Sequence, residues 1–350
     1  MFWIQDENKD FRKILIEKDE KGHTSFFLAA QNNKREIVEV LQKNGINQKP
    51  DNNKDHQART PLMVALEQGN DKVVLELCKH LMDEEITKKD IDDNNIFHFA
   101  CLSDHPGKMM TILLNALTKN VADNVSTRQN MFSDLLCEGN INQETPLHIL
   151  ASKANFSKDE FTEILRFFRG LNFYSLMKMV NIRTETPIHI SAKSGSIEFL
   201  ETVLVIAEEK HNLKSLLKLE EEDGNSALHL SSKNVKFDVK RAILEFMGKD
   251  DATEAVTKEN KFGWTQFSGN VSSRDLDSLK LMFKYINEKS FVNKPDFIDV
   301  CPLHLAAKKG HVDIFEYLIK NKADITKTGP KNKTALDIAI EKSSEELFSL

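Results

Sequence analysis

The segment Cys301-Pro302-Leu303-His304-Leu305-Ala306-Ala307 decides how this chain folds, because variants of it recur along the sequence. Its clearest other copies are Thr145-Pro146-Leu147-His148, Thr186-Pro187-Ile188-His189 and Ser226-Ala227-Leu228-His229. Weaker copies begin at Thr24, Thr60, Asn95, Thr265 and Thr334. Successive starts lie 36, 35, 50, 41, 40, 39, 36 and 33 residues apart. A period in this range is typical of stacked structural repeats.

The chemistry of each copy predicts two helices. Thr at the first position is a good N-cap, since its side chain accepts a hydrogen bond from a free amide at the helix start, and Pro is well tolerated at the first helical position. Gly195 and Gly310 follow first helices and predict the left-handed residue that ends them. Apolar residues three and four apart, as in residues 312–319, predict a second, amphipathic helix. Asp or Asn with Gly before a copy favours a tight hairpin tip.

This pattern resembles the ankyrin repeat, whose T-P-L-H-x-A signature recurs about every 33 residues. The resemblance covers nearly the whole chain and implies an all-α repeat solenoid, an ankyrin-repeat stack of helix-turn-helix units with hairpin tips. We expect residues 1–350 to form a single array of about nine to ten repeats, with residues 1–20 as a partial first repeat. The repeats are expected to start near residues 24, 60, 95, 145, 186, 226, 265, 301 and 334.

Histidine occupies the same signature position in five repeats. The resemblance implies that these side chains hydrogen-bond backbone groups and link successive repeats, and their spacing of one per repeat argues against a shared metal ion. They are His98, His148, His189, His229 and His304.

The longer repeats carry extra residues between the second helix and the next hairpin, at 119–137, 172–179, 211–219 and 250–256. Most of these stretches have the spacing of a short additional helical turn. Residues 119–130 are the most polar, and we expect them to form a mobile loop.

The apolar character of both ends predicts self-association. Residues 8–18 have the pattern of a second helix without its first helix, and the last repeat stops within its second helix. Repeat arrays normally end in caps with a polar outer face. Phe2, Trp3, Phe348 and Leu350 are apolar instead. Either these ends cover themselves in an unusual way or the chain is part of a longer protein. We expect the isolated chain to self-associate through them.

Composition and charge exclude several classes of partner. The chain has 48 Lys and Arg against 54 Asp and Glu, a net charge of −6, whereas nucleic-acid binding needs a basic face. Its apolar runs are far shorter than the ~20 residues that span a bilayer. The N-terminus does not have the pattern of a signal peptide, and four scattered cysteines favour a reducing compartment. We therefore expect a cytoplasmic protein with no membrane segment and no nucleic-acid partner.

The sequence predicts binding rather than catalysis. It contains no phosphate-binding glycine loop, no H-E-x-x-H and no G-x-S-x-G. The acidic run at residues 220–223 is typical of a solvated loop. We expect no enzymatic activity, no cofactor and no metal site, and interpret the chain as a protein–protein interaction module or scaffold.

We expect a protein partner to contact the concave face and the hairpin tips. The candidate binding residues at the tips are Phe262, Trp264, Arg183, Asn225 and Lys333. Trp is enriched among the residues that dominate interface energetics.

The repeat at Thr265 departs furthest from the signature. Gln266 replaces Pro, Ser268 replaces His, and Gly269 and Asn270 replace the small alanines. Gly and Asn are poor helix formers, so the first helix is softened there. Two interpretations remain open. Either the adjoining tryptophan anchors a partner while the array flexes, or it folds back onto residues 250–256 and shields a weak repeat.

Two other functions fit the same repeats. The tips Gly263-Trp264-Thr265 and Asp223-Gly224-Asn225-Ser226-Ala227-Leu228-His229 are similar to the cytosolic N-terminal ankyrin region of TRPA-type cation channels. A secreted ankyrin effector would show the same features.

Overall fold

The computed structural model describes residues 14–46, 54–79, 81, 83–119, 125–153, 158–168, 173–208, 213–233, 237–286 and 289–342. It divides into two compact units, Met1–Ile182 and Arg183–Leu350, here called the N-terminal and C-terminal units. The apolar end residues Phe2, Trp3, Phe348 and Leu350 lie outside the described ranges. Self-association through them, like the single array of residues 1–350, stays a prediction.

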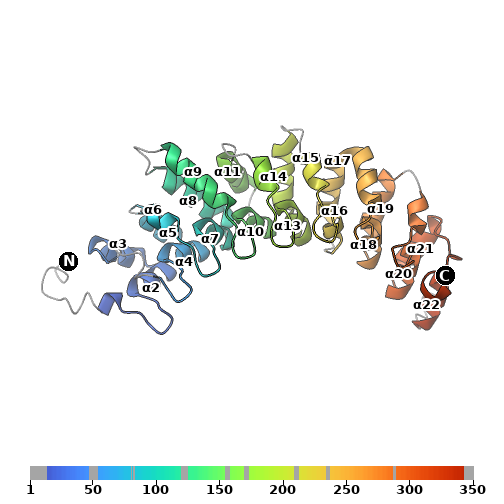
Figure 1. Cartoon of the computed structure of the whole chain (residues 1–350), viewed down its shortest axis with the longest axis horizontal. Coiled ribbons are helices and arrows are strands. Elements are labelled where there is room, and N and C mark those ends of the chain that lie inside the picture. The colour runs from blue at the N-terminus through green and yellow to red at the C-terminus, as the bar shows by residue number, and fades with distance from the viewer. Residues whose placement is uncertain are drawn as a thin grey trace. The chain divides into compact units, whose positions relative to one another are not determined.

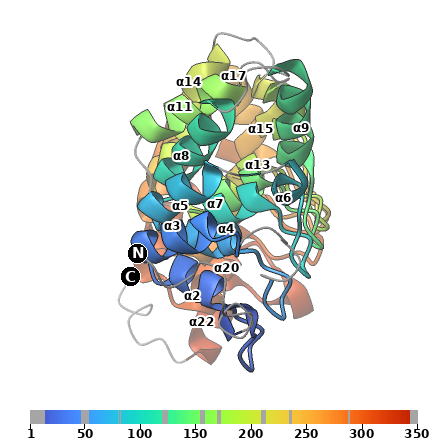
Figure 2. The same cartoon turned by 90° about the vertical axis from the view of Figure 1, so that its left-hand side faces the viewer.

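The N-terminal unit consists of helix pairs stacked in two layers (Figures 1 and 2). The first helices are α2 (Ser25–Gln31), α4 (Pro61–Glu67), α7 (Ile96–Leu102) and α10 (Pro146–Ser152). The second helices are α3 (Arg35–Lys43), α5 (Asp71–Cys78), α8 (Pro106–Lys119) and α11 (Lys158–Phe168). Each helix packs on its counterpart in the next repeat. Three further helices follow second helices: α6 (Asp83–Ile86), α9 (Val125–Cys137) and α12 (Phe173–Met177).

The C-terminal unit repeats this arrangement. Its first helices are α13 (Pro187–Ser194), α16 (Ala227–Leu230), α18 (Gln266–Ser272), α20 (Pro302–Lys309) and α22 (Ala335–Glu341). Its second helices are α14 (Ile197–Glu208), α17 (Phe237–Thr257), α19 (Leu276–Tyr285) and α21 (Val312–Lys320). The shorter elements are α15 (Leu213–Leu217) and the 3-10 turns η2 (Ser231–Lys233), η3 (Lys289–Asn293) and η4 (Pro330–Asn332). The predicted fold class, an all-α repeat solenoid, is confirmed.

Local chemistry sets the helix boundaries as the sequence predicts. The hydroxyl of Thr24 accepts a hydrogen bond from the Phe27 amide at 3.2 Å, and Thr60 caps α4 in the same way. Gly195 and Gly310 end α13 and α20 with φ of 75° and 74°, a conformation that costs glycine little. The signature residue Leu303, like its counterparts, is buried. The capping residues and the buried apolar residues therefore specify the same helix boundaries.

The signature histidines join one repeat to the next. The backbone amide of Asn95 donates a hydrogen bond to His98 Nδ1 at 3.2 Å. The ring proton therefore lies on Nε2, which donates to the carbonyl oxygen of Glu144 at 2.8 Å. The same bond to a carbonyl of the following repeat is made by His189, His229 and His304. Burial lowers the pKa of His98 to about 4, which keeps the ring neutral. The predicted linking role is confirmed for these four histidines.

Most of the extra residues that the structure describes between repeats are helical. Helices α12 and α15 are the short turns that the sequence predicts, and residues 250–256 belong to α17. The expected loop at 119–130 is wrong where the structure describes it, since α8 includes Lys119 and α9 begins at Val125. Phe132, Leu135 and Leu136 are buried, and their packing supports a helix that a polar first turn does not prevent.

Candidate protein-docking surface at the hairpin tips

One acceptor side chain, five residues before the N-cap, organises six of the hairpin tips that the structure describes. The Oδ1 atom of Asn260 accepts hydrogen bonds from the amides of Phe262 at 2.9 Å and Trp264 at 3.0 Å. The same double bond to a tip is made by Asp19, Asp55, Asp90, Asn140 and Asp296. The tips are therefore closed turns with fixed backbones.

Backbone hydrogen bonds connect neighbouring tips. In the C-terminal unit, the Lys261 amide donates to the carbonyl of Asp223 at 3.0 Å and the Phe297 amide to that of Phe262 at 3.3 Å. In the N-terminal unit, the amides of Ile91 and Ile141 donate to the preceding tips in the same way. This ladder fixes the spacing of side chains on successive tips.

A pocket of about 410 Å³ opens between the tips and first helices of the repeats at Ser226 and Thr265. It brings together three predicted binding residues, Asn225, Phe262 and Trp264. Phe262 is 57% exposed and Trp264 is half-buried. Asn225 is held from both sides: its Nδ2 donates to Glu221 Oε1 at 2.6 Å, and its Oδ1 accepts from Asn260 Nδ2 at 2.8 Å. The pocket thus combines an aromatic wall with a fixed amide.

The other two predicted residues do not line this pocket in the part of the chain that the structure describes. The ammonium group of Lys333 forms an ion pair with the carboxylate of Glu341, the last residue of α22 in the same repeat. Arg183 lies exposed on the first tip of the C-terminal unit. A binding role for either residue stays a prediction.

Sequence reasoning missed a set of exposed apolar side chains on the tips. Phe297 is 68% and Ile298 69% exposed, on the tip that follows Phe262. Phe297 also lies over Gly263, where an added Cβ would come within 2.6 Å of its ring. In the N-terminal unit the corresponding exposed residues are Ile91, Ile141 and Ile182. The sequence does contain a signal for these residues, because an apolar residue stands four positions before the N-cap in each of these tips.

The irregular repeat at Thr265 has structural compensation that the sequence does not reveal. Helix α18 forms despite Gly269, and an added Cβ there would lie 2.5 Å from Ser232 Oγ, so close packing requires glycine. Asn270 is buried and its Nδ2 donates to Met282 Sδ at 3.2 Å. Lys240 of α17 forms a buried ion pair with Asp275, the N-cap of α19. The two repeats are therefore joined by polar contacts.

The described residues offer little for catalysis. No group of three or more His, Cys, Asp or Glu side chains among them could hold a metal ion. Burial raises the pKa of Cys78 to about 12 and raises that of Cys101 further, so neither thiol is poised as a nucleophile. Within the same ranges, no helix is long and apolar enough to cross a membrane.

Stacked helix pairs with laddered tips define a helical repeat protein, and comparison with known proteins identifies the repeat. A family model described as "Ankyrin repeats (3 copies)" matches residues 269–350. Part of the chain is similar to "NF-kappa-B inhibitor cactus" of Drosophila yakuba and of Drosophila melanogaster, each 34% identical over 125 residues, 35% of this chain and 23% of the relative. A shorter match is to "Alpha-latrocrustotoxin-Lt1a" of Latrodectus tredecimguttatus, 43% identical over 58 residues, 17% of this chain and 4% of the toxin. Residues 269–350 therefore match the ankyrin-repeat family, as the signature predicts.

Proposed function

We propose that this chain is a non-catalytic protein-interaction module that docks a partner on the hairpin tips of its C-terminal unit. The observation that carries the proposal is the pocket of about 410 Å³ lined by Phe262 and Trp264. Monomeric proteins seldom leave large apolar side chains together on their surface without use. Phe297 and Ile298 extend the exposed apolar surface to the next tip.

The pocket suits a partner that inserts one apolar or aromatic side chain. Its wall is aromatic, while Asp223, Asn225 and Ser273 supply polar groups around it. Interfaces commonly combine such a desolvated anchor with a polar rim. The relatives support a protein partner, because cactus is named as an inhibitor of NF-kappa-B. The matched stretch spans about a quarter of the cactus chains. The proposal therefore does not extend to NF-kappa-B as the partner of this chain.

The test separates binding from folding with matched variants. Phe262→Ser should reduce retention of a specific partner by about tenfold with the melting temperature unchanged, because the side chain is mostly exposed. Val205→Ser, at another exposed apolar position of the same unit, is the control. Proteins captured from cell extract by the parent and by Val205→Ser, but lost from Phe262→Ser, support the proposal. Identical sets of captured proteins for all three chains would refute it.

Trp264→Ala distinguishes the two interpretations of the tryptophan. Lost capture at unchanged melting temperature supports an anchor, whereas a lowered melting temperature with capture retained assigns the side chain a purely structural role. Contacts of a partner with the concave face, with Arg183 and with Lys333 belong to the same proposal. The TRPA-type channel region and the secreted effector stay predictions.

A further inference from the structure

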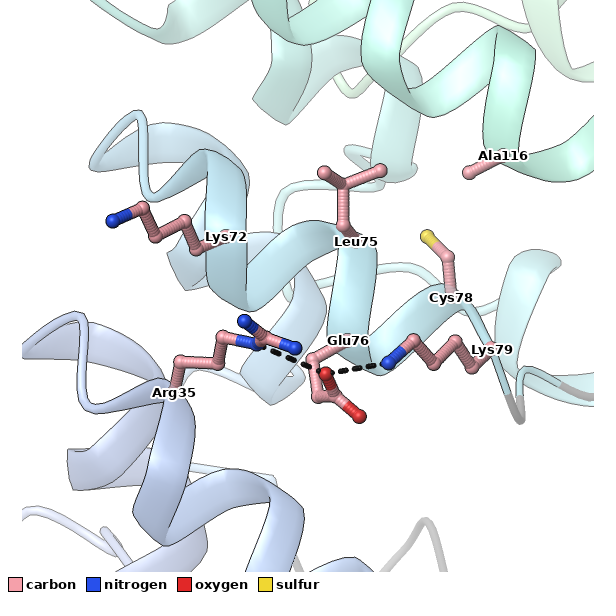
Figure 3. A pocket seen from close by; sticks show the side chains of 7 residues that line it. All are labelled: Arg35, Lys72, Leu75, Glu76, Cys78, Lys79 and Ala116. Atoms are coloured by element: carbon pink, nitrogen blue, oxygen red, sulfur yellow. Dashed lines mark hydrogen bonds and ion pairs between the residues drawn. The ribbon is translucent and has the colours of Figure 1, made fainter.

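A second pocket, of about 380 Å³, lies on the second-helix layer of the N-terminal unit (Figure 3). We call it the α5 groove. Its described lining consists of Arg35 from α3, Ala116 from α8, and the α5 residues Lys72, Leu75, Glu76 and Cys78 with the C-cap Lys79. Figure 3 shows Leu75 and Cys78 pointing toward α8, and Glu76 pointing toward α3 between Arg35 and Lys79.

Leu75 departs from the pattern of the other second helices. It stands five residues after the helix N-cap and is 48% exposed. In α8 the corresponding residue is the buried Met110. In α11 the residue is Thr162, and in the other second helices it is charged: Glu39, Glu201, Arg241, Lys280 and Glu316. Among the second helices that the structure describes, α5 is therefore the one in which this position is both apolar and exposed.

Lys72 departs from the pattern in a second way. It lies in the first turn of α5, where the helix dipole favours a negative side chain. The corresponding residues of the same five helices are all acidic: Glu36, Glu198, Asp238, Asp277 and Asp313. In α5 the acid of this turn is instead Asp71, which pairs with Lys108, so Lys72 adds a cation at the positive end of the helix dipole. Two broken local rules on one helix face indicate a functional constraint.

The charges of the groove are positive in excess. The carboxylate of Glu76 is buried, and its Oε2 accepts from Arg35 Nε at 3.1 Å and from Lys79 Nζ at 2.8 Å. Burial opposes ionisation of Glu76, but the bonds from Lys79 and Arg35 outweigh it and hold its pKa below the ordinary value. The groove thus has one carboxylate, that of Glu76, and three cationic side chains. Glu76 holds two of these, Arg35 and Lys79, in place, and Lys72 is the third.

We infer that the α5 groove binds a protein segment in which a large apolar side chain is flanked by carboxylates. The apolar side chain packs against Leu75 and Ala116, and the carboxylates approach Lys72, Arg35 and Lys79. A ligand with anionic groups alone would leave Leu75 exposed, and an apolar ligand alone would desolvate Lys72 without a counter-charge. This surface is distinct from the proposed docking tips, since it lies on second helices of the other unit.

The experiment uses a defined probe, the peptide fluorescein-Glu-Asp-Glu-Leu-Phe-Glu-Asp-Glu-amide with the dye on its N-terminus, followed by fluorescence polarisation with the full chain. Leu75→Glu should weaken binding by about tenfold or more, through lost apolar contact and added repulsion. Lys72→Glu should weaken it by about fivefold at low salt. Lys284→Glu and Ile319→Glu, exposed positions on α19 and α21, are matched controls that should bind as the parent does.

The thermal midpoint excludes a purely structural effect. Lys72→Glu restores the acidic residue typical of this helix turn, so its melting temperature should stay constant or rise while binding falls. Two further peptides complete the test, one with every acid replaced by lysine and one with Leu-Phe replaced by Ser-Ser, and neither should bind. No binding of the acidic peptide by the parent chain, equal binding of the lysine peptide, or unchanged affinity in Leu75→Glu would each overturn the inference.

Discussion

Replacing Asp275 with Asn should destabilise the C-terminal unit by about 3–5 kcal/mol, because it leaves a buried ammonium group without its counter-charge. Lys240 is fully buried and Asp275 nearly so. The carboxylate also accepts bonds from Ser278, from the amide at 3.0 Å and from the hydroxyl at 2.6 Å. Burial opposes ionisation of Asp275, but the bonds from Lys240 and Ser278 outweigh it and keep its pKa below the ordinary value. Asn has nearly the same size and is itself a good N-cap, so the substitution isolates the charge.

The repeats supply the matching control substitution. The residue that corresponds to Lys240, four positions after the N-cap, is buried and apolar in other second helices: Val38, Val74, Leu200, Leu279 and Phe315. Lys240→Met should therefore pack well, and it leaves Asp275 with its two bonds from Ser278, so we expect a loss of about 1–2 kcal/mol. The double variant Lys240→Met with Asp275→Asn should lie within about 1 kcal/mol of the parent.

Urea unfolding measures this cycle. With Trp3→Phe in every chain, fluorescence reports on Trp264, the other of the two tryptophans, which lies in the tip that precedes α18. A coupling energy of about 2 kcal/mol or more between the two positions supports a buried pair that joins the repeats. If Asp275→Asn lowers the free energy of unfolding by less than about 1 kcal/mol, or if the two losses simply add, the pair does not act as a unit and the reasoning fails.

Three further predictions concern single positions. Leu303→Asp should cost several kcal/mol by burying an unpaired carboxylate, and hydrogen exchange should show loosening concentrated in the last repeats rather than uniform from Thr24 onwards. Gly269→Ala should lower the melting temperature, since its Cβ would lie 2.5 Å from Ser232 Oγ, and an added Ser232→Gly should recover most of the loss. Lowering the pH from 7.5 to 5 should destabilise the N-terminal unit by about 2 kcal/mol through His98. The pKa of His98 is about 4 in the folded chain and about 6.5 in the unfolded chain, so in this pH range mainly the unfolded chain takes up the proton. Urea midpoints of His98→Gln should depend less steeply on pH across the same range.

The sequence predicts the repeat because its determinants are local. Thr60 and Pro61 at a helix start and Gly310 at a helix end each act within one turn, so their roles can be assigned without tertiary information. Residues 125–130 show where this reasoning fails. Their own composition favours a loop, whereas the packing of Phe132 and Leu136 later in α9 favours a helix. Burial of a later turn is not visible in the polar residues that begin it.

The candidate site could be predicted only in part for a related reason. Phe262 and Trp264 are conspicuous by residue type, and the tip that carries them is evident from spacing. The pocket also needs Ser232 and Gly269, which come from the 3-10 turn η2 and from helix α18 in two different repeats. Their meeting depends on the stacking register between repeats. The ion pair of Lys333 with Glu341 within its own repeat is likewise not evident from the sequence pattern of the tip.

A repeat protein contains its own reference set, and this strengthens the inference from α5. In a protein without repeats, an exposed leucine or a lysine in a first helical turn is unremarkable. Here the same helix position is sampled several times in one chain under the same backbone geometry, so Leu75 and Lys72 are compared with true structural equivalents. Core positions vary little among the copies because packing restricts them, whereas the position of Leu75 carries a charge in five of the other second helices that the structure describes. An apolar residue at the exposed position of Leu75 gains nothing from packing within the chain. Lys72, in addition, opposes the helix dipole. Together the two side chains give the α5 groove a chemistry that a bound partner would satisfy.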